Sequence, residues 1–528
     1  MTAPSFLFFI ADQLRADHLG CYGNPVVKTP AIDTLAAESV VFDRAYVTSP
    51  VCMPNRAAIA TGRWPSANGS RTNGVPLDLD ANTFVSRLRE AGWSTAAVGK
   101  LHFQPMGWPF EPFQLREAEE RSPGSLDPGR PDAAPRPRQE GWATWEESAR
   151  HRAELLPLPA DYYGFDTVDL LVGHGDTLTG HYTHWARDRG LDPEALAGYD
   201  RAALRDPEWD QCYRTEIPVE LYPSSYVAEK TIERLERFAA SDSPFFVFCS
   251  FPDPHHPFTP PGRFWDMHDP AEVPIPATFD QAHDGAPPHI QELIAARGRP
   301  GADPTMSWAP TEDQLRRATA AEYGSIALID ECVGRVLEAL DRLGLGETTN
   351  VILTSDHGDL FGDHGLLLKH FVHYDGVMRV PLMVRLPVRP AAHHVAGLAS
   401  SADIASTILD LADVEAYRGI QGTSLRPVLE GRSEHLRDGV LVEEDQPFGL
   451  PGLPAPVRMR TMVTEEGRLT VYAGQDFGEL YDRRADPEER VNLWDAPEGR
   501  VLRGRLHEQL VQAMAGADDF GIRPVAGA

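Results

Sequence analysis

The sequence predicts an α/β fold with a large, mostly parallel sheet sandwiched by helices, followed by a smaller C-terminal α+β region. Short, continuous apolar runs are the first indication, because strands buried on both faces of a parallel sheet have this pattern. Strands are expected at residues 5–11, 93–99, 245–251 and 350–354. Helical segments separate them, and this interleaving of strands and helices is typical of α/β architecture.

The helices are expected from their end signals and their periodicity. Thr29 is a typical N-cap with Pro30 at the first helical position, and Gly92 is a typical C-terminal residue for a second helix. The predicted helices cover residues 29–38, 84–91, 225–239, 311–343 and 403–411.

The chain of 528 residues is too long for one ordinary core. We expect a large α/β domain over residues 1–432, in which the poorly periodic stretch 105–222 forms long connections at the rim of a functional site. Short strands predicted at 439–443, 458–464 and 468–472 then precede a terminal helix. This change of pattern predicts a small α+β subdomain over residues 433–528.

The composition excludes several classes of protein. A formal net charge of −29 argues against a partner that is nucleic acid or an acidic membrane. The five cysteines, at positions 21, 52, 212, 249 and 332, are too few and too widely spaced for a disulfide framework. The N-terminus lacks a basic signal-peptide region, and no apolar segment is long enough to span a membrane. We therefore expect a cytoplasmic protein.

Lysine is rare in this chain and occurs only at positions 28, 100, 230 and 369. A compact ammonium differs from the planar guanidinium of arginine, so a lysine in such a chain suggests a position where arginine would not serve. Lys100 and Lys369 lie beside the motifs described next.

Polar residues follow the four predicted strands, and the carboxyl ends of parallel strands meet at one edge of a sheet. Each of these residues alone is a weak indication of a site, but their convergence at one edge of the sheet is informative. Three oxygen donors and one nitrogen donor among them, from Asp12, Gln13, Asp356 and His357, suit a hard divalent ion. Such an ion would polarise a sulfuryl or phosphoryl oxygen. The strand ends carry Asp12-Gln13, Lys100 with His102, His255, and Asp356-His357.

Cys52 precedes Pro54 and Arg56 at the expected start of an apolar helix, where Pro54 would occupy the first helical position. A helix N-terminus suits an anionic ligand. Arg56 and Lys100 are expected to hold anionic oxygens of the ligand. For Cys-x-Pro alone, a buried cysteine before an ordinary helix is the simpler interpretation.

The longer motif around Cys52 is more specific than Cys-x-Pro alone. Cys52-x-Pro54-x-Arg56 followed by Thr61-Gly62-Arg63 resembles the signature of the type I, formylglycine-dependent sulfatases of the alkaline-phosphatase-like superfamily. The resemblance covers nearly the whole chain. It also includes Gly99-Lys100-Leu101-His102, Pro254-His255-His256-Pro257, Ser355-Asp356-His357-Gly358, Lys369, Gly478-Glu479-Leu480-Tyr481-Asp482, Asp486-Pro487-Glu488-Glu489 and Asn492-Leu493.

The resemblance implies that Cys52 is oxidised to formylglycine (3-oxoalanine) by a formylglycine-generating enzyme. One hydroxyl of its hydrate would attack sulfur or phosphorus, and His102 would help the second hydroxyl expel the inorganic anion. His255 and Lys369 would bind the ester and help protonate the leaving oxygen. The implied metal ligands are Asp12, Gln13, Cys52, Asp356 and His357, with Ca²⁺ expected first and Mn²⁺ or Mg²⁺ as alternatives.

Two positions depart from the common sulfatase pattern. Gln13 stands where many sulfatases have Asp, and Asn55 stands where they have a small residue. Gln13 together with Asp356-His357 is similar to the branch that holds phosphonate monoester hydrolases and some alkyl or aryl sulfatases. These departures leave open the identity of the metal and the choice between sulfate and phosphonate.

The leading hypothesis is a metal-dependent hydrolase of sulfate monoesters, acting on a small anionic ester. A phosphonate monoester or phosphodiester hydrolase with the same residues is the near alternative, and promiscuity between the two is expected. A non-catalytic binding protein with unmodified Cys52 is the alternative from another class. Assembly into a homo-oligomer is left open.

Overall fold

The computed structural model describes residues 3–109, 112–121, 140–301, 303, 305–388 and 392–519. Its main feature is a ten-stranded sheet with the order β10-β2-β11-β9-β1-β8-β3-β4-β5, in which β12 also pairs with β2. The strands are β1 (Ser5–Asp12), β2 (Val40–Tyr46), β3 (Ser94–Lys100), β4 (Thr167–Val172), β5 (Thr179–Gly180), β8 (Phe245–Pro254), β9 (Thr349–Ser355), β10 (Arg379–Val380), β11 (Leu382–Arg385) and β12 (His393–Ser400).

The centre of this sheet is parallel. Strand β1 pairs in parallel with β8 and β9, and β3 pairs in parallel with β8 and β4. Phe8 on β1 lies between Phe248 and Ile352, and all residues of β1 are buried. The antiparallel pairs involve β10, β11 and β5. The predicted fold class, with its continuous apolar strands, is therefore confirmed.

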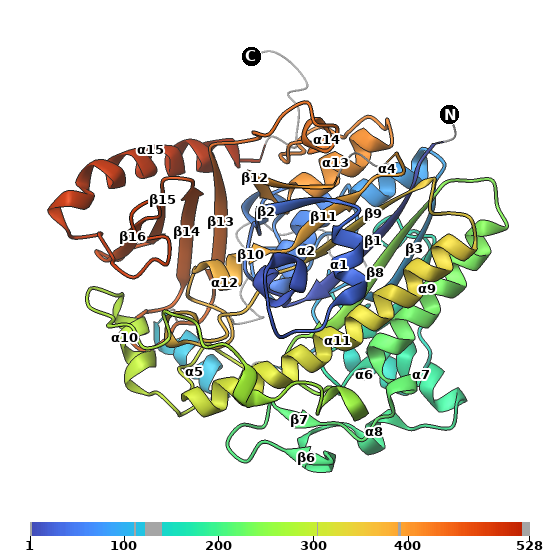
Figure 1. Ribbon diagram of the computed structural model, residues 1–528, viewed down its shortest axis with the longest axis horizontal. Helices are drawn as coiled ribbons and strands as arrows, with labels where there is room; N and C mark the ends of the chain where they lie inside the picture. The colour runs from blue at the N-terminus through green and yellow to red at the C-terminus, as the bar shows by residue number, and fades with distance from the viewer. Residues whose placement is uncertain are drawn as a thin grey trace.

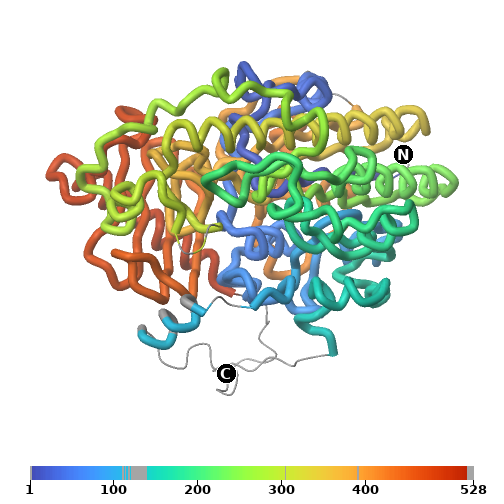
Figure 2. The backbone as a smooth tube through the Cα atoms, turned by 90° about the horizontal axis from the view of Figure 1, so that it is seen from below, coloured from blue at the N-terminus to red at the C-terminus, as the bar shows by residue number. Residues whose placement is uncertain are grey.

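Helices cover both faces of the sheet (Figures 1 and 2). One apolar core joins α1 (Pro30–Ala36), α9 (Pro223–Ala239) and the long α11 (Glu312–Arg342) to one face. A second core joins α2 (Cys52–Thr61), α4 (Phe84–Glu90) and α13 (Asp403–Leu411) to the strands. Since each face buries its own apolar cluster, the strands between them must be apolar on both sides.

Helix α2 begins at Cys52, two residues before the expected start at Pro54. Pro54 is tolerated as the third residue because the first N–H groups of a helix have no partner within the helix. Gly62 ends α2 in the left-handed conformation (φ 57°), as expected for a C-terminal glycine. Cys52 thus lies within the first turn.

A second, four-stranded antiparallel sheet stands beside the main one in Figure 1. It consists of β13 (Gly439–Gln446), β14 (Val457–Thr464), β15 (Gly467–Tyr472) and β16 (Gly478–Asp482). Helix α15 (Arg500–Gly516) buries leucines against this sheet. The expected short strands and terminal helix are present, while the proposed boundary at 432/433 stays a prediction.

The stretch 105–222 contributes more to the sheet than long connections would. Its strand β4 pairs in parallel with β3 at the end of the parallel region. Residues 110–111 and 122–139 of this stretch lie outside the described residues. The other α-helices and β-strands of the described residues are short: α3 (Pro65–Asn68), α5 (Pro112–Arg121), α6 (Ser148–Ala153), α7 (His181–Asp188), α8 (Pro193–Leu196), α10 (Pro288–Ala295), α12 (Asp375–Met378), α14 (Arg426–Leu429), β6 (Leu204–Arg205) and β7 (Tyr213–Arg214).

In the described part of the chain, no helix has the length and apolar character that a membrane crossing requires.

Candidate active site

Four adjacent strands bring the expected residues to one edge of the main sheet. The strands β9, β1, β8 and β3 are neighbours in that order and run parallel. Their carboxyl ends carry, in the same order, Asp356-His357, Asp12-Gln13, His255, and Lys100 with His102. The convergence expected from the sequence is present, and every one of these side chains is buried.

Cys52 and Lys369 join this edge from outside the four strands. The Nζ atom of Lys369 lies 3.7 Å from the Sγ atom of Cys52. Cys52 is 1% exposed and Lys369 is 2% exposed. A buried cation therefore faces the sulfur at the N-terminus of α2, where the helix also favours negative charge.

The Lys369 ammonium is surrounded by groups that accept hydrogen bonds. Its Nζ atom lies 2.8 Å from the Nε2 atoms of both His255 and His357, and it donates to Oε1 of Gln13 at 3.1 Å. Because an ammonium has three donors and no acceptor, these partners match its capacity. Lys369 thus links three of the four strand ends to Cys52.

Lys100 occupies the other side of the site. Its ammonium pairs with Oδ2 of Asp12, and Nε2 of His174 lies 2.7 Å from its Nζ atom. The ring of His174 also stacks on His255, with the ring centroids 3.8 Å apart. His174 is therefore part of the cluster.

The guanidinium of Arg56 forms most of its hydrogen bonds with other residues of the site. Its Nε donates to Oδ2 of Asp356 at 2.6 Å, and its Nη1 donates to the carbonyl of Lys100 and to Oγ of Ser250. Its buried Nη2 forms no hydrogen bond and lies 3.9 Å from Oδ2 of Asp12. Arg56 thus connects the carboxyl ends of β9 and β3.

Asn55 fixes the start of the helix relative to the metal-ligand candidates. Its Nδ2 donates to the carbonyl of Asp356 at 2.6 Å, while its Oδ1 accepts from Thr48 and Ser401. A small side chain at this position would leave these buried groups without partners. The departure at Asn55 therefore has a local structural explanation.

The surrounding charges favour the thiolate form of Cys52. Burial alone would raise the pKa of this thiol, but the ammonium groups of Lys369 and Lys100, with hydrogen bonds from His102 and His174, hold it well below its usual value. Burial would likewise raise the pKa of Asp12, and the charges of Lys100 and Arg56 keep it well below its usual range. The site thus stabilises negative charge although the chain as a whole is acidic.

Three histidines of the site, His255, His102 and His174, favour their neutral form. Burial lowers the pKa of His255, and the neighbouring His174 and Lys369 lower it further. Burial and Lys100 lower the pKa of His102 in the same way, and that of His174 to about 3. Neutral imidazoles can accept a proton or a hydrogen bond, which suits acid–base roles.

The donor set fits a divalent cation. Ligand atoms of Asp12, Cys52, His255 and His357 all lie within 4.8 Å of one another. The Oδ1 atom of Asp12 is buried without a hydrogen-bond partner, and Oε1 of Gln13 points into the same cluster. Asp356 is adjacent, with Oδ1 3.7 Å from Nε2 of His357. Oxygen donors with imidazole suit several divalent metals.

Two site residues have strained backbones that buried carboxylates hold in place. Gln13 has φ 70°, and its N–H donates to Oδ1 of Asp356 while its Nε2 donates to Asp359. His102 has φ 56°, and its N–H donates to Oε2 of Glu146 at 2.7 Å. Positive φ in such residues persists only where the surroundings enforce it, and it is common at functional sites.

Sequence reasoning did not assign the supporting residues of the site. His174 lies in the stretch 105–222, for which the sequence predicts only long connections. Glycines with positive φ flank it, and a Cβ at Gly175 would approach Pro257 to 2.7 Å, so its loop packs closely on the His255 loop. Asn73, whose Nδ2 lies 3.9 Å from Sγ of Cys52, belongs to an Asn-Gly pair that the sequence alone marks only as a turn.

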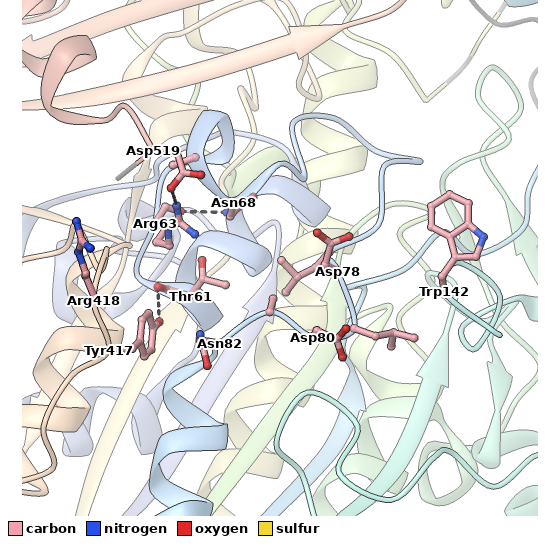
Figure 3. Close-up of a pocket in the computed structure, with 14 residues that line it drawn as sticks. Thr61, Arg63, Asn68, Asp78, Asp80, Asn82, Trp142, Tyr417, Arg418 and Asp519 are labelled. Carbon is pink, nitrogen blue, oxygen red and sulfur yellow. Dashed lines mark hydrogen bonds and ion pairs between the residues drawn. The ribbon is translucent and has the colours of Figure 1, made fainter. Parts of the chain in front are cut away.

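A separate cavity of about 360 Å³ lies at the opposite end of α2 (Figure 3). Arg63 pairs there with Asp519, and the hydroxyl of Tyr417 donates to the carbonyl of Thr61. The ten residues of α2 span about 15 Å. Arg63, although part of the motif around Cys52, therefore serves this far end of the helix and not the cluster.

A buried cluster of cations, a helix N-terminal cysteine and donors for a divalent ion, all at one edge of an α/β sheet, define a site for an anionic ester. Comparisons with known proteins identify the family. The sulfatase family model matches residues 4–114 and 178–414, and a C-terminal model described as N-sulphoglucosamine sulphohydrolase matches residues 362–516. The chain belongs to the sulfatase family, an enzyme family of sulfate ester hydrolases.

Solved structures and curated relatives agree with this assignment. The phosphonate monoester hydrolase of Agrobacterium radiobacter is 27% identical with a TM-score of 0.75, covering 97% of this chain and 96% of that one. The uncharacterized sulfatase YidJ of Escherichia coli is 27% identical over 97% of this chain and 88% of its own length. An arylsulfatase of Clostridium perfringens is 26% identical over 98% and 95%. The expected resemblance is confirmed.

Proposed function

We propose that this protein hydrolyses sulfate monoesters with a formylglycine nucleophile made from Cys52. The observation that carries the proposal is the position of Cys52 in the first turn of α2, with Nζ of Lys369 3.7 Å from its sulfur. A helix N-terminus and nearby ammonium groups suit a tetrahedral anion held against this side chain. Membership of the sulfatase family supports the same chemistry.

The maturation step involves a formylglycine-generating enzyme as a partner. Cys52 is 1% exposed, and every residue of α2 is buried. An external enzyme cannot reach such a side chain in the folded protein. Oxidation of the thiol to an aldehyde is therefore expected before the chain folds.

The hydrate of the aldehyde supplies one hydroxyl as nucleophile and a second hydroxyl through which the inorganic anion is released. His102 is proposed to take the proton of that second hydroxyl. Burial and Lys100 lower its pKa, so it is available as a neutral base. Its Nδ1 atom is buried without a hydrogen-bond partner, and Glu146 holds its backbone in place.

Lys369 and His255 are proposed to act on the other side of the ester. The two side chains are in contact, with 2.8 Å between Nζ and Nε2. Lys369 would neutralise anionic oxygens of the substrate, and Lys369 and His255 together would help protonate the leaving oxygen, with the Lys369 ammonium as the source of the proton. Lys100, held by Asp12 and His174, would bind a further oxygen. Arg56 would keep Asp356 and the Lys100 backbone in register.

A divalent metal is proposed at Asp12, Gln13, Asp356, His357 and the modified residue 52. Bound there, it would offset the carboxylates and polarise an oxygen of the ester. Ca²⁺ is the first expectation, with Mn²⁺ and Mg²⁺ as alternatives. His255 is close enough to be an additional donor.

Phosphonate monoester or phosphodiester hydrolysis is the second candidate function. The similarity to the phosphonate monoester hydrolase of Agrobacterium radiobacter, over 97% of this chain, supports it. Both reactions transfer a tetrahedral group through an anionic transition state, so the same cations would serve both. We propose activity on both classes, with sulfate esters preferred.

The test compares kcat/KM for an aryl sulfate with that for a phenylphosphonate monoester, using protein co-expressed with a formylglycine-generating enzyme. Sulfate preference supports the first assignment, and phosphonate preference replaces it with the second. Loss of both activities in Cys52→Ala is expected, whereas equal activity in that variant would contradict the mechanism. A cytoplasmic location and assembly into a homo-oligomer remain proposals.

A further inference from the structure

Lys369 lies in the middle of a strained segment. Leu368, His370 and Phe371 have φ values of 70°, 87° and 63°, and none of them is glycine. A left-handed conformation costs such residues about 1–2 kcal/mol each, so the segment keeps its shape only if other groups enforce it. The backbone on both sides of the lysine is therefore informative about how its ammonium is placed.

On the N-terminal side of Lys369, residues of the candidate active site hold this segment. The N–H of Leu368 donates to Oδ1 of Asp359 at 2.9 Å, and the same carboxylate accepts from Nε2 of Gln13. Trp308 and Leu367 form an isolated backbone bridge just before. This side is anchored by groups that belong to the site itself.

On the C-terminal side, the anchor comes from the second sheet. Glu444 is on β13 and is 0% exposed. Its Oε1 accepts from the N–H of Phe371 at 3.2 Å and lies 3.5 Å from Nδ1 of His370. Its Oε2 accepts from Nε2 of His373 at 3.1 Å. One carboxylate thus contacts three of the four residues that follow Lys369.

The remaining groups around Glu444 complete this arrangement. Nε2 of Gln446 donates to Oε1 of Glu444 at 3.0 Å, and Nδ1 of His373 lies 2.7 Å from Oγ1 of Thr461 on β14. Burial would raise the pKa of Glu444, but the hydrogen bonds with His370 and His373 hold it well below its usual range. An ionised carboxylate is an acceptor only, and every group that faces this one can donate.

Burying an ionised carboxylate costs free energy. Well-packed apolar residues of similar volume are often neutral or stabilising in its place, because a buried charge must first lose its hydration. Among the described residues, the hydrogen-bond and ion-pair partners of the Glu444 carboxylate are the segment after Lys369 and its own strand neighbour Gln446. Its placement is explained if the segment needs an acceptor at this point.

We infer that Glu444 is the positioning residue for Lys369: it holds the strained segment 368–373 from the second sheet, so that the ammonium stays beside Cys52 and His255. This inference rests on the proposed function in that it assigns the consequence to catalysis. It also gives the second sheet a direct part in the active site, through a side chain that touches neither the substrate nor the proposed metal.

The first test is Glu444→Gln, which keeps the size of the side chain but turns an amide NH₂ toward groups that already donate. We expect kcat to fall about 10- to 100-fold with KM changed less than about threefold, the pattern of an interaction needed in the transition state. Asp445→Asn is the matched control, since Asp445 is the next residue on β13 and pairs with Arg460. The control should keep wild-type kinetics.

A double-mutant cycle separates positioning from general destabilisation. In a Lys369→Met background, Glu444→Gln should reduce kcat/KM by less than about threefold, because residues that act as a unit are not additive. Full additivity would overturn the inference. So would a variant that melts earlier yet keeps wild-type kcat when assayed well below its melting temperature, since Glu444 would then be only structural.

Hydrogen exchange gives a readout that does not depend on activity. In Glu444→Gln the amides of residues 368–373 should exchange at least about tenfold faster than in wild type, while Asp445→Asn should leave them unchanged. Unchanged exchange in Glu444→Gln would overturn the inference. If converted wild-type protein hydrolyses no sulfate or phosphonate ester, the proposed function fails, and this exchange comparison alone then decides whether Glu444 holds the segment.

Discussion

Replacing Lys369 is expected to reduce turnover strongly while leaving the fold intact. The ammonium lies 3.7 Å from Sγ of Cys52, in a site that excludes bulk water. Two unit charges about 4 Å apart interact by about 4 kcal/mol at an effective dielectric constant of about 20. If the transition state gains most of a unit charge at that distance, Lys369→Met forfeits about 3 kcal/mol, or about two orders of magnitude in kcat.

Lys369→Arg keeps the charge and tests the shape of the site. Imidazole nitrogens of His255 and His357 lie 2.8 Å from the ammonium, which leaves no space for a planar guanidinium. We therefore expect a loss of at least about tenfold in kcat for this variant as well, since misplacing a catalytic group by about 1 Å can cost far more than its charge.

Steady-state kinetics on an aryl sulfate measure both effects, after peptide mass spectrometry has shown equal formylglycine content in all samples. Lys230→Met is the matched control, because Lys230 pairs with Glu233 on the surface of α9. It should retain wild-type kinetics. If Lys369→Met and Lys369→Arg both stay within about threefold of wild type, Lys369 does not act at the reacting centre and the assignment is wrong.

Four further expectations follow from particular contacts. Asn55→Ala should lower the free energy of unfolding by about 3 kcal/mol in urea denaturation, because it leaves several buried groups unpaired; a change below about 1 kcal/mol would contradict this. Burial raises the pKa of Glu146 to about 7 from its usual 4.5. The folded state therefore binds this proton more tightly than the unfolded state does. As the pH rises from 4.5 to about 7, the free energy of unfolding should fall more steeply in wild type than in Glu146→Gln, by up to about 1.4 kcal/mol per pH unit; equal slopes would refute the shift. His174→Phe keeps the ring but removes the acceptor beside Lys100, so kcat should fall about tenfold while His174→Gln recovers part of it; wild-type kinetics in the Phe variant would exclude that role. Chelation by EDTA should abolish turnover and added Ca²⁺, Mn²⁺ or Mg²⁺ should restore it, whereas full activity in metal-free protein would exclude the proposed metal.

The sequence predicts the frame of the site well because strand ends obey a simple geometric rule. Residues that follow parallel strands meet at one edge, and the strands before Asp12, Lys100, His255 and Asp356 are apolar enough to be recognised. The rarity of lysine pointed to Lys100 and Lys369, and both are buried in the cluster. Lys230, by contrast, pairs on the surface.

The supporting residues could not be predicted, because their function depends on long-range contacts. Glu146, Glu444 and Asp359 are ordinary acidic residues in the sequence, and only folding brings them to the strained backbones that they hold. His174 lies in a stretch without clear periodicity, and the strand β4 that ends two residues before it is not predicted from the sequence. Positive φ at His102 leaves no mark in the sequence, since no glycine is present there.

The start of α2 shows the limit of local signals. Proline favours the first helical position, yet the helix begins two residues earlier, at Cys52. The N–H of Asn55 already donates to the carbonyl of Val51, so the first turn forms without an amide hydrogen from Pro54. This small shift places Cys52 inside the helix, where its sulfur faces Lys369.

The most direct test of the account is the mass of the tryptic peptide that ends at Arg56, measured together with turnover. Protein should be prepared with and without a co-expressed formylglycine-generating enzyme. We predict that the peptide shows the conversion of CH₂SH to an aldehyde or its hydrate, and that sulfate ester hydrolysis rises in proportion to the converted fraction. Full activity in protein whose residue 52 retains the mass of cysteine would contradict the central claim.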